Sequence, residues 1–239
     1  MSLRDFWIAL QFMTRLPTPR VVESRPDDLA RASPWFPAAG LVIGACLALI
    51  ARIFQSADPW IVALAVVVAW IWITGALHLD GLGDVADAFG AAHGKPERFI
   101  AVLGDPHAGS FAVVAISLQI AAKLVLLAEL ATGPTGWALL LIPAWARLGT
   151  LVWSKMLVSL KPGLGASVSN RAGWNVIAGW SVVLAIGALA GAVPSLLAIA
   201  LIPAVAVYWQ WRLGGITGDC HGASIEVTET LLLAACVLG

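Results

Sequence analysis

WIVALAVVVAWIWITGALH, residues 60–78, is the stretch of sequence that decides the fold. It runs for 18 residues without an ionisable side chain before it reaches His78. A helix needs about 20 predominantly apolar residues to cross the hydrocarbon core of a membrane. This stretch therefore predicts a membrane-spanning helix that ends beside a polar segment.

The composition of the whole chain also indicates a membrane protein. Of its 239 residues, 60% are hydrophobic and only 12% are charged, and the mean hydropathy is +0.89. Soluble proteins carry about 25% charged residues, so the solvent of this chain is lipid. The net charge of zero provides no field that would favour nucleic acid. The three cysteines form no CxxC pair, which argues against a disulfide framework or a zinc knuckle.

Working outward from residues 60–78, we find seven candidate spans bounded by charges, Pro or Gly: residues 35–54, 60–78, 110–130, 135–157, 174–193, 195–212 and 229–239. The last has only eleven residues, so it either crosses partly or begins inside the preceding loop. The apolar run 6–13 predicts an interfacial helix. We expect an all-α fold: a polytopic integral membrane helical bundle with about seven spans plus an N-terminal interfacial helix. Residues 1–239 then form a single domain, with an N-terminal segment at 1–33 and the transmembrane bundle at 34–239.

The basic residues predict the orientation of this bundle. If all seven segments cross, eleven of the fourteen Lys and Arg residues fall on one side of the membrane. The short links on the other side, at residues 56–59, 131–134 and 191–194, contain none. Positive loops face the cytoplasm, so the N-terminus is expected there. Of the basic residues within spans, Arg52 and Lys123 either snorkel or face the bundle interior, and Arg147 is expected to pair with an acid or to contact a substrate.

Acidic residues gather on the same side, most densely in HLDGLGDVADAFG, residues 78–90. Asp80, Asp84 and Asp87 stand at i, i+4 and i+7, so they share one face if the helix of the second span continues. Three neighbouring carboxylates repel one another unless a cation neutralises them, and hard oxygen ligands suit Mg²⁺ or Mn²⁺. Gly81 allows a phosphate or a neighbouring helix to approach the backbone. The alternative is a solvated helix end.

The run GDPHAGS, residues 104–110, lies just before the third span. Pro106 disfavours helix at Asp105, and Gly109 then begins the next helix. The free N–H groups at such a helix start suit an anion. The alternative is an ordinary helix-entry turn.

A third polar run, GGITGDCHGASIEVTE, occupies residues 214–229. Its glycines make a backbone that can wrap a phosphate, around Gly215, Thr217 and Gly218. Asp219 and Glu226 stand seven residues apart and can share a helical face. The alternative is a plain flexible loop.

These runs together resemble the cobalamin synthase family, the adenosylcobinamide-GDP ribazoletransferases. The resemblance spans the whole chain. It rests on FMTRLP at 12–17, WFPAAG at 35–40, GALHLDGLGDVAD at 75–87, GDPHAGSF at 104–111 and GGITGD at 214–219. The LHLDGLxDxxD and GGxTGD patterns, in this order, are its most specific parts.

The resemblance implies transfer of α-ribazole, or of its 5′-phosphate, onto adenosylcobinamide-GDP with release of GMP and dependence on Mg²⁺. It implies an enzyme of the bacterial inner membrane. Metal ligands would be Asp80, Asp84 and Asp87, with Asp219 as a fourth. The catalytic residues would be His78 or Asp105 as the base, and Arg147.

The groups expected to contact the substrates come from the three polar runs described above. These are Gly81, Gly109, Gly215, Thr217, Gly218 and Glu226. The expected partners are the two substrates and membrane lipid, with a homo-oligomer as a further option and no nucleic acid.

Two rival functions belong beside this one. A CDP-alcohol phosphotransferase that makes phospholipid uses a similar acidic signature and the same type of reaction. An ion-coupled transporter would place ionisable groups near the membrane midplane and often shows two related halves. The acids here gather at one interface and no internal repeat is evident, so transport is the weaker alternative.

Overall fold

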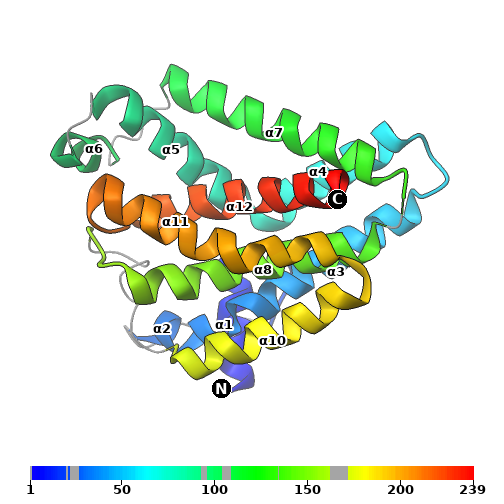
Figure 1. The fold of residues 1–239 in the computed structure, drawn as a ribbon, viewed down its shortest axis with the longest axis horizontal. Helices are drawn as coiled ribbons and strands as arrows, with labels where there is room; N and C mark the ends of the chain where they lie inside the picture. Colours follow the sequence, from blue (N-terminus) through cyan, green and yellow to red (C-terminus); the bar gives the residue numbers. More distant parts are fainter. Residues whose placement is uncertain are drawn as a thin grey trace.

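The protein is described by a computed structural model that covers residues 2–19, 21, 27–92, 96–103, 109–133, 135–161 and 172–239. All regular elements within these ranges are helices, which confirms the all-α prediction (Figure 1). Their order is α1 (Leu3–Met13), α2 (Asp28–Ala32), η1 (Ser33–Trp35), α3 (Phe36–Ile53), α4 (Pro59–Thr74), α5 (Leu77–Ala92), α6 (Pro96–Val102), α7 (Ser110–Leu130), α8 (Gly136–Met156), α10 (Trp174–Gly191), η2 (Val193–Leu197), α11 (Ala198–Leu213) and α12 (Gly218–Leu238).

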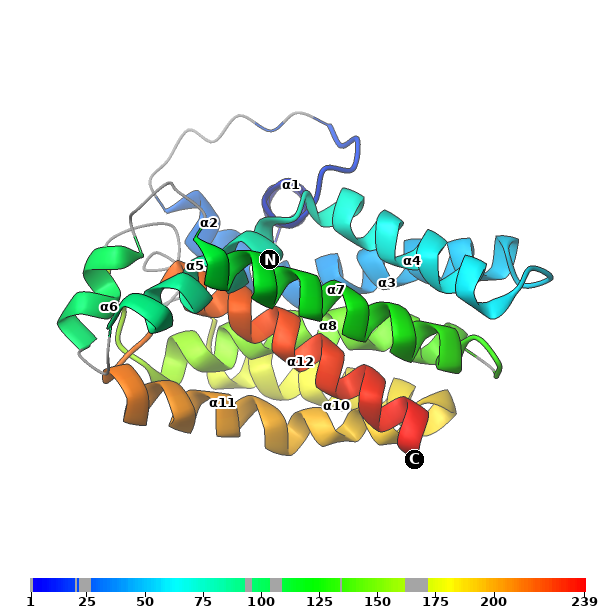
Figure 2. The same cartoon turned by 90° about the horizontal axis from the view of Figure 1, so that it is seen from above.

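The long helices run back and forth between two ends of one bundle. Six of them are long and apolar enough to cross a membrane, and α4 together with α5 makes a seventh candidate that is bent by 86°. The links at 54–58 and 131–133 lie at one end of the bundle, and α5 and α6 lie at the other (Figures 1 and 2). The chain is therefore a multi-pass helical membrane protein, as predicted.

Helix α8 forms the centre of the bundle. In the most apolar 18-residue stretch of α8, 83% is buried inside the protein, whereas in the corresponding stretch of α10 only 17% is buried. Helix α3 packs on α8 through Gly40 and Gly44, which are spaced as in a GxxxG pair. A Cβ at Gly40 would lie 2.5 Å from the Cα of Ala144, so only glycine permits this backbone approach. Without a hydrophobic driving force between helices in lipid, such close packing is what holds them together.

The N-terminal helix α1 forms over the predicted apolar run. Ser2 and Asp5 make a capping box: the Ser2 hydroxyl accepts from the Asp5 N–H at 3.2 Å, and the Asp5 carboxylate accepts from the Ser2 N–H at 3.0 Å. Figure 2 views α1 end-on while the bundle helices run across the picture. Its apolar face, including the fully buried Ile8, packs on the bundle. Helix α1 thus lies across the bundle axis.

One predicted boundary was wrong. The second span ends at Thr74 rather than at His78, because Gly75 and Ala76 both take left-handed φ angles, +63° and +60°, which stop helix α4. For the last span, the alternative that it begins inside the preceding loop is confirmed, since α12 starts at Gly218 and is a full-length helix. Thr217 starts it by accepting the N–H of Cys220 at 3.2 Å.

Candidate active site

Helix α5 carries the densest acidic cluster of the sequence. It is helical as predicted, so Asp80, Asp84 and Asp87 do share one face, but it leaves α4 at 86° instead of continuing it. The N–H of Arg15 donates to the carbonyl of Ile73 at 2.7 Å, which braces the end of α4 just before the bend. Asp80 is exposed and the other two carboxylates are half-buried. The bend therefore directs a short acidic helix away from the span.

Asp87 caps helix α7. Its carboxylate accepts from the backbone N–H groups of Gly109 at 2.6 Å and Ala112 at 3.0 Å. A Cβ at position 109 would lie 2.5 Å from the Asp87 carboxylate, so glycine is needed there. The sequence predicted that the start of this helix would suit an anion, and the anion that it holds is the chain's own Asp87.

The first turn of α12 crosses α5 at backbone contact. A Cβ at Gly81 would lie 2.9 Å from the carbonyl oxygen of Asp219, and one at Gly222 would lie 3.3 Å from the carbonyl oxygen of His78. These two glycines bring Asp219 next to the acidic face of α5. The sequence predicted that either a phosphate or a neighbouring helix would approach Gly81, and in the structure that neighbour is helix α12.

The carboxylates of α5 and α12 interact unfavourably. The Asp84 charge is repelled first by Asp80, then by Asp219 and Asp87, and it is attracted by Lys161. Lys161 also attracts Asp219. Within the described ranges, these four carboxylates form no ion pair, and no three His, Cys, Asp or Glu residues are gathered closely enough to hold a metal ion. The cluster is therefore a region of excess negative charge, which Lys161 offsets only in part.

Behind α5 lies a buried ionic network centred on Arg147. The Arg147 side chain is fully buried, and it forms an ion pair with Glu229 of α12. Its second terminal nitrogen lies 3.2 Å from Nδ1 of His78. Because a guanidinium only donates, Nδ1 of His78 must accept, which places the proton of a neutral imidazole on Nε2. Arg147 thus joins the first turn of α5 to α8 and α12.

Lys123 of α7 completes this network. Its ammonium lies 2.7 Å from a carboxylate oxygen of Glu226 and 2.6 Å from one of Glu229, and 4.4 Å from the ring centroid of Trp70. Gln119 donates to the same Glu226 carboxylate at 2.9 Å. Two cations thus face two carboxylates, so the buried charge is balanced, as a low-dielectric interior requires.

The sequence predicts that Lys123 either snorkels or faces inward, and in the structure it faces inward. Its pairing with Glu229 was not predicted. A usable signal was present: Gln119 and Lys123 stand at i and i+4 in an otherwise apolar span, and Glu226 and Glu229 stand at i and i+3. Matching polar stripes on two spans indicate that the spans pack against each other.

The remaining predicted residues have scattered positions. Gly215 is buried where residues 214–217 pair with 158–160, and a Cβ there would lie 2.5 Å from the carbonyl oxygen of Val158. Thr217 caps α12, while Gly218 is exposed with open space around it. Asp105 lies outside the described residues. The predicted wrapping loop is thus mostly helix, because residues 218–229 are the start of α12.

Comparison with known proteins identifies the family. The model of the family described as cobalamin-5-phosphate synthase matches residues 5–237. A protein of Thiobacillus denitrificans named adenosylcobinamide-GDP ribazoletransferase is 52% identical, with 97% of this chain and 95% of the relative covered. Proteins of the same name from Novosphingobium aromaticivorans and Laribacter hongkongensis are 48% and 46% identical, each with 99% of this chain and with 98% and 97% of the relative covered. No solved structure matches. The chain therefore belongs to the cobalamin-5-phosphate synthase family, a family of membrane-embedded transferases.

Proposed function

We propose that this chain transfers α-ribazole, or α-ribazole 5′-phosphate, onto adenosylcobinamide-GDP and releases GMP. The names of its relatives support the substrates. The observation that carries the chemistry is the group of unpaired carboxylates where α5 crosses α12. Displacement at a pyrophosphate needs above all a site that holds the groups in line and balances their charge.

The proposed transfer forms one phosphorus–oxygen bond and breaks another. A ribazole hydroxyl oxygen forms a bond to the phosphorus nearer the cobinamide. The bond from that phosphorus to the bridging oxygen breaks, and GMP departs with that oxygen. The hydroxyl proton passes to a base. Asp105 and His78 are the two predicted bases. Nδ1 of His78 accepts from Arg147 and its Nε2 carries the proton, so this buried imidazole has no free nitrogen to receive the hydroxyl proton. Asp105, which lies outside the described residues, is therefore the base that we propose.

A divalent cation, Mg²⁺ by the family resemblance, matches the chemistry of the donors at this site, although within the described ranges the carboxylates do not lie close enough together to hold an ion as they stand. Asp80, Asp84 and Asp219 are hard oxygen ligands that repel one another and have no paired cation within the described ranges. We infer that these three would have to draw closer together to hold the ion, which would supply charge neutralisation at the transferred phosphoryl group when bound. Asp87 was predicted as a further ligand. Since its carboxylate already accepts two backbone N–H groups, its part in this proposal is to hold α7.

A direct assay tests the assignment. Purified protein in detergent or nanodiscs receives adenosylcobinamide-GDP and α-ribazole with Mg²⁺, and GMP release is followed by chromatography. We expect GMP and the cobalamin product in equal amounts. A parallel reaction with a CDP-alcohol and glycerol phosphate tests the rival phospholipid synthesis. Absence of GMP in the first reaction, or product in the second alone, would overturn the proposal.

A further inference from the structure

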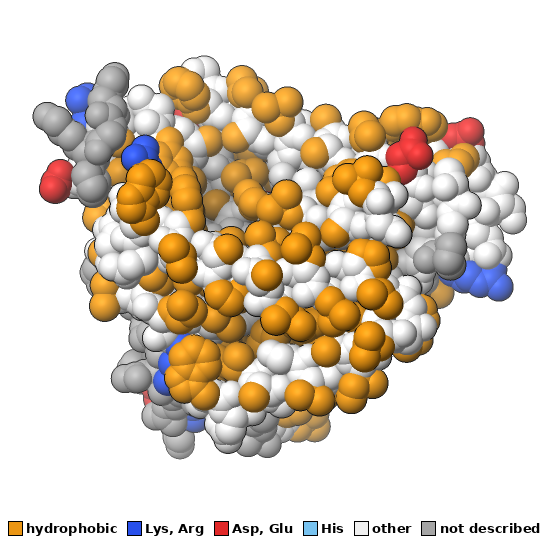
Figure 3. Space-filling model, viewed as in Figure 1, with side chains coloured by type: hydrophobic (Ala, Val, Ile, Leu, Met, Phe, Trp, Pro, Cys, Tyr) orange, Lys and Arg blue, Asp and Glu red, His pale blue; other side chains and the backbone are white. Residues whose placement is uncertain are grey.

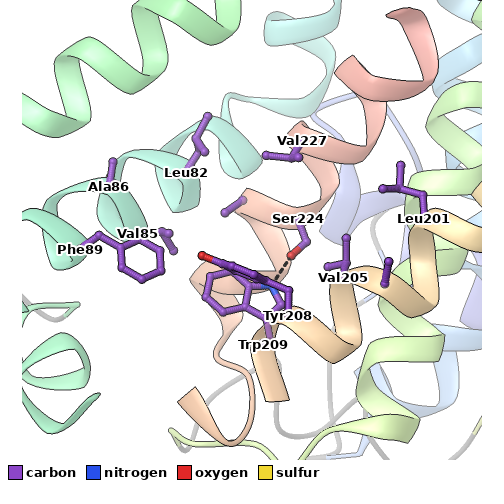
Figure 4. A pocket seen from close by; sticks show the side chains of 12 residues that line it. Leu82, Val85, Ala86, Phe89, Leu201, Val205, Tyr208, Trp209, Ser224 and Val227 are labelled. Carbon is purple, nitrogen blue, oxygen red and sulfur yellow. Dashed lines mark hydrogen bonds between the residues drawn. The ribbon is translucent and has the colours of Figure 1, made fainter. Parts of the chain in front are cut away.

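A pocket of about 520 Å³ lies on the side of α5 that faces away from the carboxylates. Its lining comes from α5, α11 and α12 (Figure 4). Leu82 and Phe89, seven residues apart, belong to one face of α5, and Asp84 points to the other because two residues along a helix turn through about 200°. Helix α5 therefore separates two different environments.

The polar atoms within the lining are largely satisfied by the protein itself. The indole N–H of Trp209 donates to the Ser224 hydroxyl at 2.7 Å, and that hydroxyl donates to the carbonyl of Cys220 at 2.6 Å. The other side chains of the lining are apolar, apart from the phenol of Tyr208. Such a pocket provides few free hydrogen-bonding groups and no lining charge to bind a nucleotide or a phosphate. It suits a hydrocarbon chain.

The pocket opens where the protein meets lipid. Two of its lining residues, Tyr208 of α11 and Val227 of α12, are 43% and 41% exposed. Figure 3 shows this face hollowed between α5 and α11 and rimmed by hydrophobic side chains. Because α11 and α12 are both candidate spans, the medium in front of the opening is acyl chains.

A positive charge stands at one end of the pocket. The guanidinium of Arg212 lies 5.2 Å from the ring centroid of Phe89, a lining residue, and Arg212 is one helical turn beyond Tyr208. Arg212 forms no ion pair in the part of the chain that the structure describes. Beside it, Trp211 has the exposure of an aromatic residue at the membrane–water interface.

We propose that this groove binds an anionic glycerophospholipid, with one acyl chain in the pocket and the phosphate beside Arg212. An apolar cavity that opens to lipid and ends at an interfacial cation matches both parts of such a molecule. The substrates are a poorer match, because a helix of about 10–12 Å diameter lies between the pocket and the carboxylates. The proposal does not depend on the function proposed above.

Photolabelling tests the proposal on the full-length protein in nanodiscs. The probe is phosphatidylglycerol with a diazirine in one acyl chain, and adducts are mapped by peptide mass spectrometry. We expect adducts concentrated on the lining residues of α5, α11 and α12, and reduced several-fold by Ala204→Phe, which fills the groove mouth. The control Ala190→Phe adds the same bulk at an exposed position of α10 and should leave the labelling unchanged. Both variants are first checked for a monodisperse elution profile.

A second variant tests the head-group site separately. Arg212→Gln should lower the preference for phosphatidylglycerol over phosphatidylcholine, measured by competition, about fivefold, the equivalent of about 1 kcal/mol. Even labelling of all lipid-facing helices, or unchanged labelling in Ala204→Phe, would show an ordinary lipid shell and overturn the proposal. Displacement of the probe by α-ribazole or adenosylcobinamide-GDP would instead make the groove a substrate subsite.

Discussion

At the scale of single residues, similar carboxylates have different roles because their neighbours differ. Asp87 accepts two backbone N–H groups of α7, and Glu229 is fully buried between Lys123 and Arg147. Asp84 has no such partner within the described ranges, and its nearest charges are mostly negative. Unpaired charge is costly to maintain, so the carboxylates without partners are the ones that we assign to function.

Asp84→Asn tests that assignment. The variant keeps the size of the side chain and removes the charge, so we expect transfer to fall on the order of 10²-fold while membrane insertion and thermal stability are retained. GMP release and the elution profile are measured together. Asp58→Asn is the matched control, since Asp58 caps α4 at the opposite end of the bundle. Near-normal turnover in Asp84→Asn would show a merely hydrated helix end.

We expect substitutions in the buried network to change the free energy of unfolding. Lys123→Met leaves two buried carboxylates facing one cation, and we expect it to lower the free energy of unfolding by about 3–5 kcal/mol. Adding Glu226→Gln removes the surplus negative charge and leaves the Arg147–Glu229 pair in place. The double variant should therefore be more stable than Lys123→Met alone, as measured by thermal unfolding in detergent. Additive losses would contradict the network.

At the scale of elements, the decisive feature is the bend between α4 and α5. Gly75 and Ala76 end the span in left-handed conformations, and α5 then leaves at 86° with its acidic face beside the first turn of α12. A straight continuation would have carried the three aspartates along the span axis instead. The bend thus brings the carboxylates of α5 next to Asp219 of α12.

Gly75→Ala tests the bend. At a φ of +63° an added Cβ costs about 1–2 kcal/mol, and it would also meet the Arg15 side chain. We expect lower thermal stability together with a lower transfer rate, because α5 must shift. Gly179→Ala is the control: it lies within α10 with open space around it, so it should be neutral or slightly stabilising. Unchanged activity and stability in Gly75→Ala would contradict this role of the bend.

At the scale of the whole molecule, the links fall at two ends that differ in charge. Residues 54–58 and 131–133 contain no Lys or Arg, whereas Lys161 lies near enough to Asp84 and Asp219 to attract both carboxylates. We infer that the site end faces the cytoplasm, where a nucleotide-linked substrate is available.

Cysteine accessibility measures this orientation. In a background without the natural cysteines, Ser56→Cys and Ser159→Cys place exposed thiols at opposite ends of the bundle. An impermeant maleimide should label Ser56→Cys in intact cells and Ser159→Cys only after the membrane is permeabilised. The reverse pattern would place the site outside and would contradict a cytoplasmic N-terminus.

The sequence by itself determined the fold class, the number of candidate spans and the acidic runs that carry the family resemblance, because hydropathy and local spacing are properties of the chain read in order. It left the start of the last helix open between residue 229 and the preceding loop, since a capped, glycine-rich helix start resembles a loop in sequence. Only the tertiary structure determined which charged side chains pair with one another and which carboxylate caps a helix. Glu229 pairs with Lys123 and Arg147, and Asp87 with α7, across separations of 22 to 106 residues. Those pairings depend on how helices cross in space, which local spacing along one helix does not specify.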